Sequence, residues 1–275
     1  MNLNLTDKIT ILYNLLVIIF VSVFWTKIDG FAYHLTFNLS VILLVLLLSL
    51  YQKRSYSIHL VHLWYPVFIY GLLYNQTGLI NRVIIPHFLD DFFLNLDIRI
   101  FGEFPGFFLH GGYGSGFWDE FFHVFYFSYY VAIPVTGLFL YRRDEKLFTT
   151  YIFQLSFLFY LCFLIYILLP VEGPLKLRMD HYRETGLFRT IVDFIYAKGE
   201  NPGAAFPSSH VAATTLVAWW GSKHFPKFRV CYWGIVLFLS IATVYCMFHY
   251  AVDVFAGILL AILLIFLFNK VKQLH

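Results

Sequence analysis

Eight long apolar runs, separated by short polar connectors, constrain the fold of this chain more than any other feature of its sequence. The runs cover approximately residues 9–25, 33–51, 58–74, 117–141, 147–169, 207–222, 229–248 and 250–268. A helix needs about 20 apolar residues to cross the hydrocarbon core of a bilayer, and most of these runs reach or approach that length. The sequence therefore predicts an all-α, polytopic membrane helix bundle with about eight spans.

Composition and charge argue against soluble and nucleic-acid-binding proteins. Hydrophobic residues make up 60% of the chain and charged residues only 13%, whereas soluble domains are about 45–50% apolar and about 25% charged. The formal net charge of +3 is too small to indicate binding to nucleic acid. Cys162, Cys231 and Cys246 all lie inside apolar runs, which favours packing over a metal site or a disulfide.

The basic residues between the runs predict the orientation of the chain. With a cytoplasmic N-terminus, eleven Lys and Arg residues fall on the cytoplasmic side and eight on the other side. Five of these eight lie in the long loop 170–206, and the short loops carry most of the orientation signal. We therefore expect both termini in the cytoplasm and loop 170–206 in the periplasm or extracellular space. The compact chain suits a bacterial inner membrane.

A first polar motif, Pro207-Ser208-Ser209-His210, opens an apolar run on the extracytoplasmic side of this topology. Proline suits the first turn of a helix, and serine caps the free amides there. Because a helix N-terminus with small neighbours attracts phosphate, Ser208 and Ser209 are candidate phosphate ligands and His210 is a candidate general acid. The alternative is an ordinary serine-capped membrane helix with a histidine at the interface.

A second motif pairs His249 with Asp253, four residues later at the start of the last run. Residues with this spacing share one face of a helix. A carboxylate that holds one ring nitrogen fixes the tautomer of the histidine and leaves the other nitrogen free to act as nucleophile. A charge at the start of an apolar span also needs a partner, so the alternative is a buried pair with a structural role.

A basic cluster of Lys176, Arg178 and Arg183 lies upstream of both motifs. Arginine is suited to bidentate contact with phosphate, so these three residues are candidate phosphate ligands. The alternative is a basic loop beside lipid headgroups, which is a common arrangement. Under the topology above, the basic cluster and the two histidine motifs fall on one face of the membrane and can converge.

Together, the three clusters resemble the motifs of the type 2 phosphatidic acid phosphatase superfamily, which are Lys-x6-Arg-Pro, Pro-Ser-Gly-His and Ser-Arg-x5-His-x3-Asp. Lys176 and Arg183 have the first spacing, and residues 207–210 match the second motif with serine in place of glycine. His249 and Asp253 match the end of the third. The resemblance implies a six-helix phosphatase-like core, a phosphohistidine on His249 oriented by Asp253, and a proton donor in the second motif. It implies neither a metal ion nor a cofactor.

Where the sequence departs from these motifs, it resembles one branch of that superfamily. The first motif lacks its final proline, and Ala242 and Thr243 replace the Ser-Arg of the third motif, which removes a phosphate-binding arginine. The segments 169–174 and 243–245 resemble inositol phosphorylceramide synthase and its bacterial relatives. This resemblance favours Arg178 as the phosphate ligand, and it leaves open whether water or another hydroxyl accepts the transferred group.

The motifs divide the chain into N-terminal membrane helices in 1–75, an interfacial or re-entrant segment in 76–116 and a catalytic membrane core in 117–275. The acidic residues Asp90, Asp91 and Asp97 of the middle segment lack the glycine and arginine of alcohol phosphotransferase motifs. We therefore expect this segment to cover the site without holding a metal ion. His59 and His62 lack a third metal ligand and are expected at the membrane interface.

The expected function is that of a membrane lipid phosphate phosphatase, which acts through a phosphohistidine at the extracytoplasmic face without a metal ion. The alternative is a phospholipid headgroup transferase like inositol phosphorylceramide synthase, in which a hydroxyl replaces water as the acceptor. A second alternative is a non-catalytic membrane transporter or scaffold. The expected partner is a lipid phosphate or phospholipid, and the sequence favours no particular lipid and no oligomeric state.

Overall fold

The computed structural model describes residues 3–113, 116–181, 186–199 and 201–273. Its helices are α1 (Leu5–Val23), η1 (Trp25–Lys27), α2 (Phe31–Tyr51), α3 (Tyr56–Ile80), α4 (Asp90–Phe101), α5 (Pro105–Tyr113), α6 (Gly116–Arg143), α7 (Glu145–Leu168), α8 (Leu175–His181), α9 (Leu187–Gly199), α10 (Ser209–His224), η2 (Pro226–Phe228), α11 (Arg229–Tyr245) and α12 (Ala251–Gln273). Extended pairing within these residues is limited to an isolated bridge between Val171 and Ala204. The predicted all-α fold is confirmed.

Six helices of the described chain are long and apolar enough to cross a membrane, namely α1, α2, α6, α7, α11 with η2, and α12. This finding confirms a polytopic helix bundle, while spans at α3 and α10 stay predictions. Helix α10 has only 16 residues, of which twelve are buried, and it packs against α6, α7, α11 and α12. Because its neighbours shield α10 from lipid, it needs neither the length nor the apolar surface of an outer helix.

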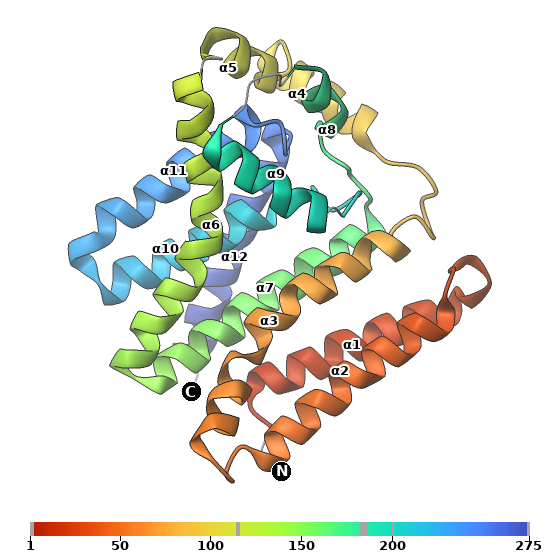
Figure 1. Ribbon diagram of the computed structural model, residues 1–275, viewed down its shortest axis with the longest axis vertical. Helices are drawn as coiled ribbons and strands as arrows, with labels where there is room; N and C mark the ends of the chain where they lie inside the picture. Colours follow the sequence, from red (N-terminus) through yellow and green to blue (C-terminus); the bar gives the residue numbers. More distant parts are fainter. Residues whose placement is uncertain (1–2, 114–115, 182–185, 200, 274–275) are drawn as a thin grey trace.

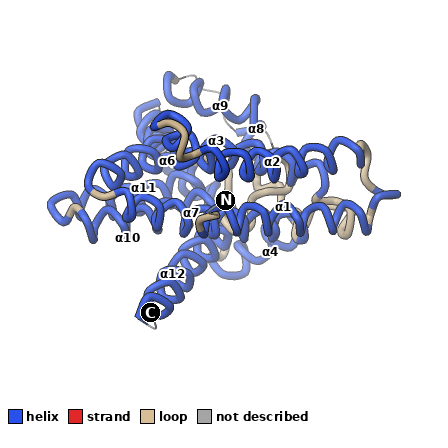
Figure 2. Tube along the Cα trace, turned by 90° about the horizontal axis from the view of Figure 1, so that it is seen from below, coloured by secondary structure: helices blue, strands red, loops and turns tan. Residues whose placement is uncertain are grey.

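Helix α7 is the middle of the bundle. It packs against α1 and α3 on one side and against α6 and α10 on the other, and α1 and α2 form an outer hairpin. Figure 1 shows the two termini at one end of the bundle and helices α4, α5, α8 and α9 gathered at the other end. In the perpendicular view of Figure 2, the C-terminal part of α12 projects from the remaining helices.

Aromatic side chains fill the space around α7 and join it to its neighbours. Tyr151 and Tyr166 are among the largest fully buried side chains of the protein. Their hydroxyls do not remain unpaired, since Tyr151 donates to the carbonyl of Ile133 at 3.0 Å and Tyr166 to that of Pro207 at 2.9 Å. Buried tyrosines combine apolar contact with a directional hydrogen bond, so α7 fixes both α6 and the chain that enters α10.

A buried polar cluster joins α1 to α3 and includes His62, for which the sequence predicted a position at the membrane interface. The Nε2 atom of His62 lies 3.0 Å from both carboxylate oxygens of Asp7, and the two side chains are 1% and 0% exposed. Tyr65 also donates to Asp7, at 3.1 Å. His59 instead forms a partly exposed pair with Glu145. The sequence around His62 gave no sign that Asp7 of α1 is its partner.

We expect His62→Ala to destabilise the protein by about 3 kcal/mol, because it leaves a buried carboxylate without its histidine partner. The cost falls at the low end of the range for a broken buried pair since Tyr65 still donates to Asp7. The matched control is His59→Ala, which removes an exposed pair that contributes about 1 kcal/mol or less. Chemical unfolding in mixed micelles measures both variants, and equal effects would contradict a stabilising role for the buried pair.

Candidate active site

The turn between α11 and α12 positions His249. Helix α11 ends at Tyr245, and the backbone amides of Phe248 and His249 both donate to the carbonyl of Thr243, at 3.0 and 3.1 Å. Met247 has a φ of 54°, in the left-handed region, and so reverses the chain at this point. His249 therefore lies in the turn before α12 and not on the helix itself.

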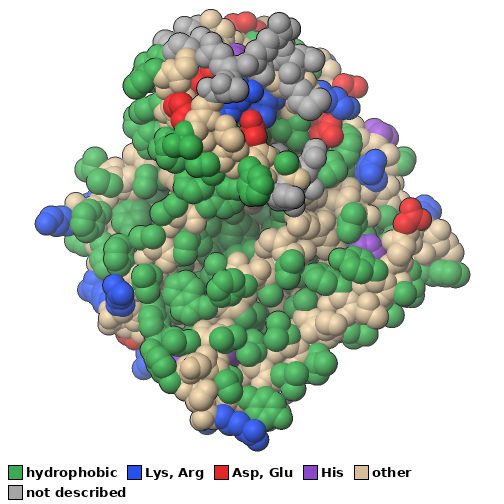
Figure 3. All heavy atoms as spheres, in the orientation of Figure 1, with side chains coloured by type: hydrophobic (Ala, Val, Ile, Leu, Met, Phe, Trp, Pro, Cys, Tyr) green, Lys and Arg blue, Asp and Glu red, His purple; other side chains and the backbone are tan. Residues whose placement is uncertain are grey.

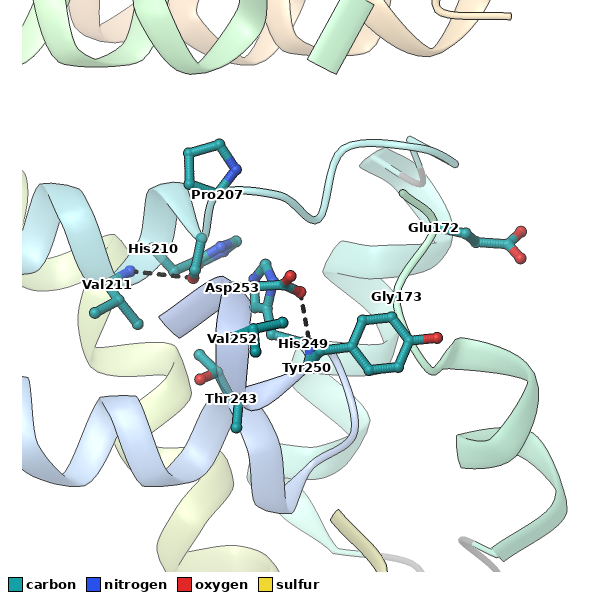
Figure 4. A network of polar contacts seen from close by, with 12 residues as sticks. Glu172, Gly173, Pro207, His210, Val211, Thr243, His249, Tyr250, Val252 and Asp253 are labelled. Atoms are coloured by element: carbon teal, nitrogen blue, oxygen red, sulfur yellow. Dashed lines mark hydrogen bonds and ion pairs between the residues drawn. The ribbon is translucent and has the colours of Figure 1, made fainter. Parts of the chain in front are cut away.

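Asp253 lies in the first turn of α12, beside His249 (Figure 4). One of its carboxylate oxygens is 3.4 Å from Nδ1 of His249 and accepts a hydrogen bond from the amide of Tyr250 at 2.9 Å. The i,i+4 spacing thus brings the two side chains together, although the pair spans a turn and not one helix face as the sequence suggested. Within the described chain, neither ring nitrogen of His249 has a hydrogen-bond partner. Nδ1 lies at ion-pair distance from Asp253, and Nε2 is left available to a substrate.

Ser208 caps α10 and places His210 in the first turn of that helix. The hydroxyl of Ser208 accepts from the amide of Val211 at 3.4 Å, and the amide of Ser208 donates to the carbonyl of Asp253 at 3.0 Å. Ser209 is the first helical residue and is buried. The capping expected from the sequence is therefore present, and it ties the start of α10 to the start of α12.

His210 and His249 face each other in the centre of the site, with ring centroids 5.8 Å apart. The Nε2 atom of His210 is 3.2 Å from the hydroxyl of Tyr126, a fully buried residue of α6. The ring of Tyr126 also packs on that of Phe248, with centroids 4.4 Å apart. Tyr126 therefore positions both histidine segments, and no pattern distinguishes it from the other 19 tyrosines of the sequence.

The basic residues proposed from the sequence occupy different environments. Arg178 turns toward the His249 segment, where its Nε donates to the carbonyl of Cys246 at 3.0 Å. Lys176 extends into solvent, with a side chain that is 81% exposed and 3.6 Å from Glu172. Arg183 lies outside the described residues. Among the described members of the cluster, the geometry favours Arg178 as a phosphate ligand.

Helix α9 adds a second arginine and an acidic partner that the sequence did not single out. Asp193 accepts a hydrogen bond from Nη2 of Arg178 at 2.6 Å and lies 3.5 Å from Nε of Arg189. Glu120 of α6 holds the start of α9 by accepting from the amides of Phe188 and Arg189, at 3.0 and 3.3 Å. The contacts of Glu120 join segments that are distant in sequence, and Asp193 lies on a helix without a recognisable motif, so no pattern in the sequence pointed to either residue.

Asp90, at the start of α4, joins the chain after α7 to the His249 turn. Its carboxylate accepts from the amides of Glu172 and Gly173, at 2.9 and 2.8 Å, and from the hydroxyl of Tyr250 at 3.0 Å. Burial raises the pKa of Asp90 above its ordinary value. Gly173 has a φ of 86°, and a Cβ atom there would lie 2.6 Å from the carbonyl oxygen of Phe248, so this close approach requires glycine.

Asp97 holds the N-terminus of α12 from α4. Its two carboxylate oxygens accept from the amides of Ala251 and Val252, at 2.8 and 3.0 Å, and burial raises its pKa. Across the described residues, no group of three or more His, Cys, Asp or Glu side chains could hold a metal ion. Asp90 and Asp97 instead anchor the protein segments that carry His249 and Asp253.

Comparison with known proteins identifies the family. A family model described as the PAP2 superfamily matches residues 92–267, which is more than half of the chain. The chain belongs to the PAP2 superfamily. The region that matches the PAP2 superfamily contains His210, His249, Asp253 and Arg178 and leaves out helices α1 to α3.

A curated relative also lies in the branch that the sequence motifs resemble. The inositol phosphorylceramide synthase catalytic subunit aur1 of Schizosaccharomyces pombe is 40% identical to this chain over 68 residues. The match covers 25% of this chain and 16% of the relative. The two matches confirm the resemblance to the PAP2 superfamily and its inositol phosphorylceramide synthase-like branch. No solved structure matches the chain.

Proposed function

We propose that this protein is a membrane enzyme that cleaves a lipid phosphate or phosphodiester through a phosphohistidine on His249. The observation that carries the proposal is the position of His249 between Asp253 and His210. Its Nδ1 atom lies 3.4 Å from the carboxylate, and its ring centroid lies 5.8 Å from that of His210. Membership of the PAP2 superfamily supports the same chemistry.

In the proposed first step, the lone pair on Nε2 of His249 attacks phosphorus, and the bond to the leaving oxygen breaks. His210 donates a proton to that oxygen, so a neutral alcohol departs. Asp253 accepts the Nδ1–H of His249 and stabilises the positive charge on the ring. In the second step, His210 removes a proton from the acceptor, whose oxygen attacks phosphorus. The P–N bond then breaks, and His249 regains its lone pair.

Two features are proposed to hold the phosphate. The start of α10, with Ser208 and Ser209, presents first-turn amides and the positive end of the helix dipole. Arg178 brings a guanidinium next to the His249 turn, and its planar geometry suits two phosphate oxygens. Lys176 is too exposed for this role, and Arg183 stays a prediction from the sequence.

We expect Arg178→Lys to lower kcat/KM for a lipid phosphate by about 10- to 100-fold, because a hydrogen bond to a charged group contributes about 1.5–3 kcal/mol and lysine cannot replace a bidentate contact. The matched control is Lys176→Ala in the same cluster, which should stay within about twofold since solvent screens its charge. The measurement is kcat/KM of both variants and of the unmodified protein in the same detergent. A larger loss at Lys176 than at Arg178 would contradict the assignment.

Water is proposed as the acceptor, which makes the protein a lipid phosphatase. The second candidate is a headgroup transferase, and the relative named inositol phosphorylceramide synthase catalytic subunit favours it. Release of phosphate from a panel of lipid phosphates by the purified protein, with His249→Ala alongside, tests the first candidate. If no phosphate appears, but a headgroup moves once phosphatidylinositol and an acceptor lipid are supplied together, the transferase is the correct assignment.

The chemistry proposed for His249 and His210 needs no divalent metal ion. We therefore expect excess chelator to leave the rate of phosphate release unchanged, because histidine, arginine and helix amides supply the nucleophile, the proton and the positive charge. The measurement is turnover before and after incubation with chelator. Inhibition that added divalent ions reverse would contradict the phosphohistidine mechanism.

The proposed site acts at the extracytoplasmic face of the membrane, in a bacterial inner membrane, with both termini in the cytoplasm. The distribution of basic residues supports this orientation. The positions of the termini, at the end of the bundle opposite α4, α5, α8 and α9, are compatible with it (Figure 1).

A further inference from the structure

An apolar cavity of about 350 Å³ lies between α3 and α6, and His210 is among the residues that line it. Its walls include Gly71 from α3, Tyr129 from α6 and Phe163 from α7, and Ser209 lines it together with His210. Figure 3 shows a hollow lined by hydrophobic side chains between α3 and α6, below the charged side chains at the upper end of the molecule. The cavity therefore reaches one of the two histidines of the candidate active site, His210.

The surroundings of the cavity indicate a hydrocarbon ligand from the bilayer. The two helices that flank it also carry exposed apolar side chains, including Phe68 and Leu72 on α3 and Val131 on α6, which are 75%, 55% and 45% exposed. A volume of about 300–1,000 Å³ is usual for ligand sites, so this cavity is small and suits one chain better than two. A chain that enters from the lipid side would bring its polar end to His210.

We propose that this cavity binds the hydrocarbon chain of a lipid alcohol, with the hydroxyl at His210. The inference rests on the proposed function, in which His210 gives a proton to a departing alcohol oxygen or takes one from an accepting hydroxyl. The chain of that alcohol must then extend away from phosphorus on the side of His210. His210 is among the residues that line the cavity, and its buried Nδ1 atom has no hydrogen-bond partner within the described residues, so a ligand hydroxyl would supply a partner that the protein does not.

Part of the cavity wall lies outside the region that matches the PAP2 superfamily. The match to the PAP2 superfamily begins at residue 92, whereas α3 ends at Ile80 and supplies Val67, Tyr70, Gly71, Tyr74 and Asn75 to the wall. The walls from α6, α7, α9 and α10 belong to the matched region. A substitution on α3 therefore tests the proposed chain site through a wall that lies outside the matched region.

Gly71 offers a way to fill the cavity without disturbing the protein. A Cβ atom built on Gly71 meets no other atom within 4 Å, and the same is true of Gly234 on α11, which is not among the residues that line the cavity. Gly71→Trp therefore places an indole in the cavity, and Gly234→Trp is a matched control with the same change on another helix. Gly71→Leu adds less volume and should give an intermediate effect if the larger variant folds poorly.

The direct test uses a photoreactive long-chain fatty alcohol and needs no turnover. We expect saturable labelling of the helices that line the cavity, which are α3, α6, α7, α9 and α10, in the unmodified protein and in Gly234→Trp. Gly71→Trp should reduce this labelling by at least about tenfold, because each excluded methylene weakens binding about fourfold. Labelling of Gly71→Trp equal to that of the unmodified protein, or labelling confined to other helices, would overturn the proposal.

A kinetic test separates the cavity from the proposed function. The ratio of kcat/KM for dioleoyl phosphatidic acid to that for dibutanoyl phosphatidic acid should fall by at least about tenfold in Gly71→Trp and stay unchanged in Gly234→Trp. An unchanged ratio in Gly71→Trp would reject the cavity as the chain site. Absence of any turnover by the unmodified protein would reject the phosphatase, while the photolabelling result would still decide the cavity.

Discussion

His249→Ala is expected to lower kcat for every lipid phosphate substrate by about ten-thousandfold or more, the scale found when a covalent nucleophile is removed. The substitution leaves the hydrogen bond from the amide of residue 249 to Thr243 in place, so the turn before α12 should keep its shape. Turnover of radiolabelled phosphatidic acid in detergent micelles gives the rate. Unfolding in the same micelles is the control, and near-normal turnover by a folded variant would remove His249 from the role of nucleophile.

Asp253→Asn is expected to lower kcat by about ten-thousandfold, because an amide can present its N–H to the ring and hold the wrong histidine tautomer. If Asp253 had only a structural role, kcat of a folded Asp253→Asn variant would stay unchanged. The asparagine oxygen can still accept from the amide of Tyr250, as the carboxylate does at 2.9 Å, so the start of α12 should remain intact. An unchanged kcat in a folded variant would make Asp253 a structural residue, and a loss confined to KM would place it in binding.

The histidine motifs could be found in the sequence because their chemistry is local. Ser208 caps the helix that begins one residue later, and Asp253 lies within one turn of the chain from His249. Polar residues at the ends of apolar runs are conspicuous, since they need partners in a membrane. The spacing predicted the contact between His249 and Asp253, but the turn that creates it depends on Met247 and on the carbonyl of Thr243.

The supporting contacts could not be predicted, because they join segments that lie far apart in the sequence. Tyr126 reaches His210 across 84 positions, and Asp97 reaches the amide of Ala251 across 154 positions. Asp193 pairs with Arg178 across only 15 positions, but its helix carries no motif. The sequence indicated only that Asp97 belongs to a segment that covers the site, and its contacts with the start of α12 are visible only in the fold.

The length of the apolar runs predicted the helices that face lipid. It was a weaker guide to helices that other helices surround. The long runs of α1, α2, α6, α7, α11 and α12 satisfy the criterion for membrane spans. Helix α10 is short and carries polar residues such as Thr214 and Ser222, which are buried against other helices. Tertiary packing supplies the environment that lipid would otherwise demand, so length and hydropathy understate such a helix.

The most direct test of the central claim is a rapid-quench reaction with phosphatidic acid, followed by mass spectrometry of the peptide that contains His249. The account predicts a transient phosphoryl group on His249 that forms before product is released and is absent from His249→Ala. Phosphate release at a normal rate, with no phosphoryl group on His249 at any time or with the group on another residue, would contradict it.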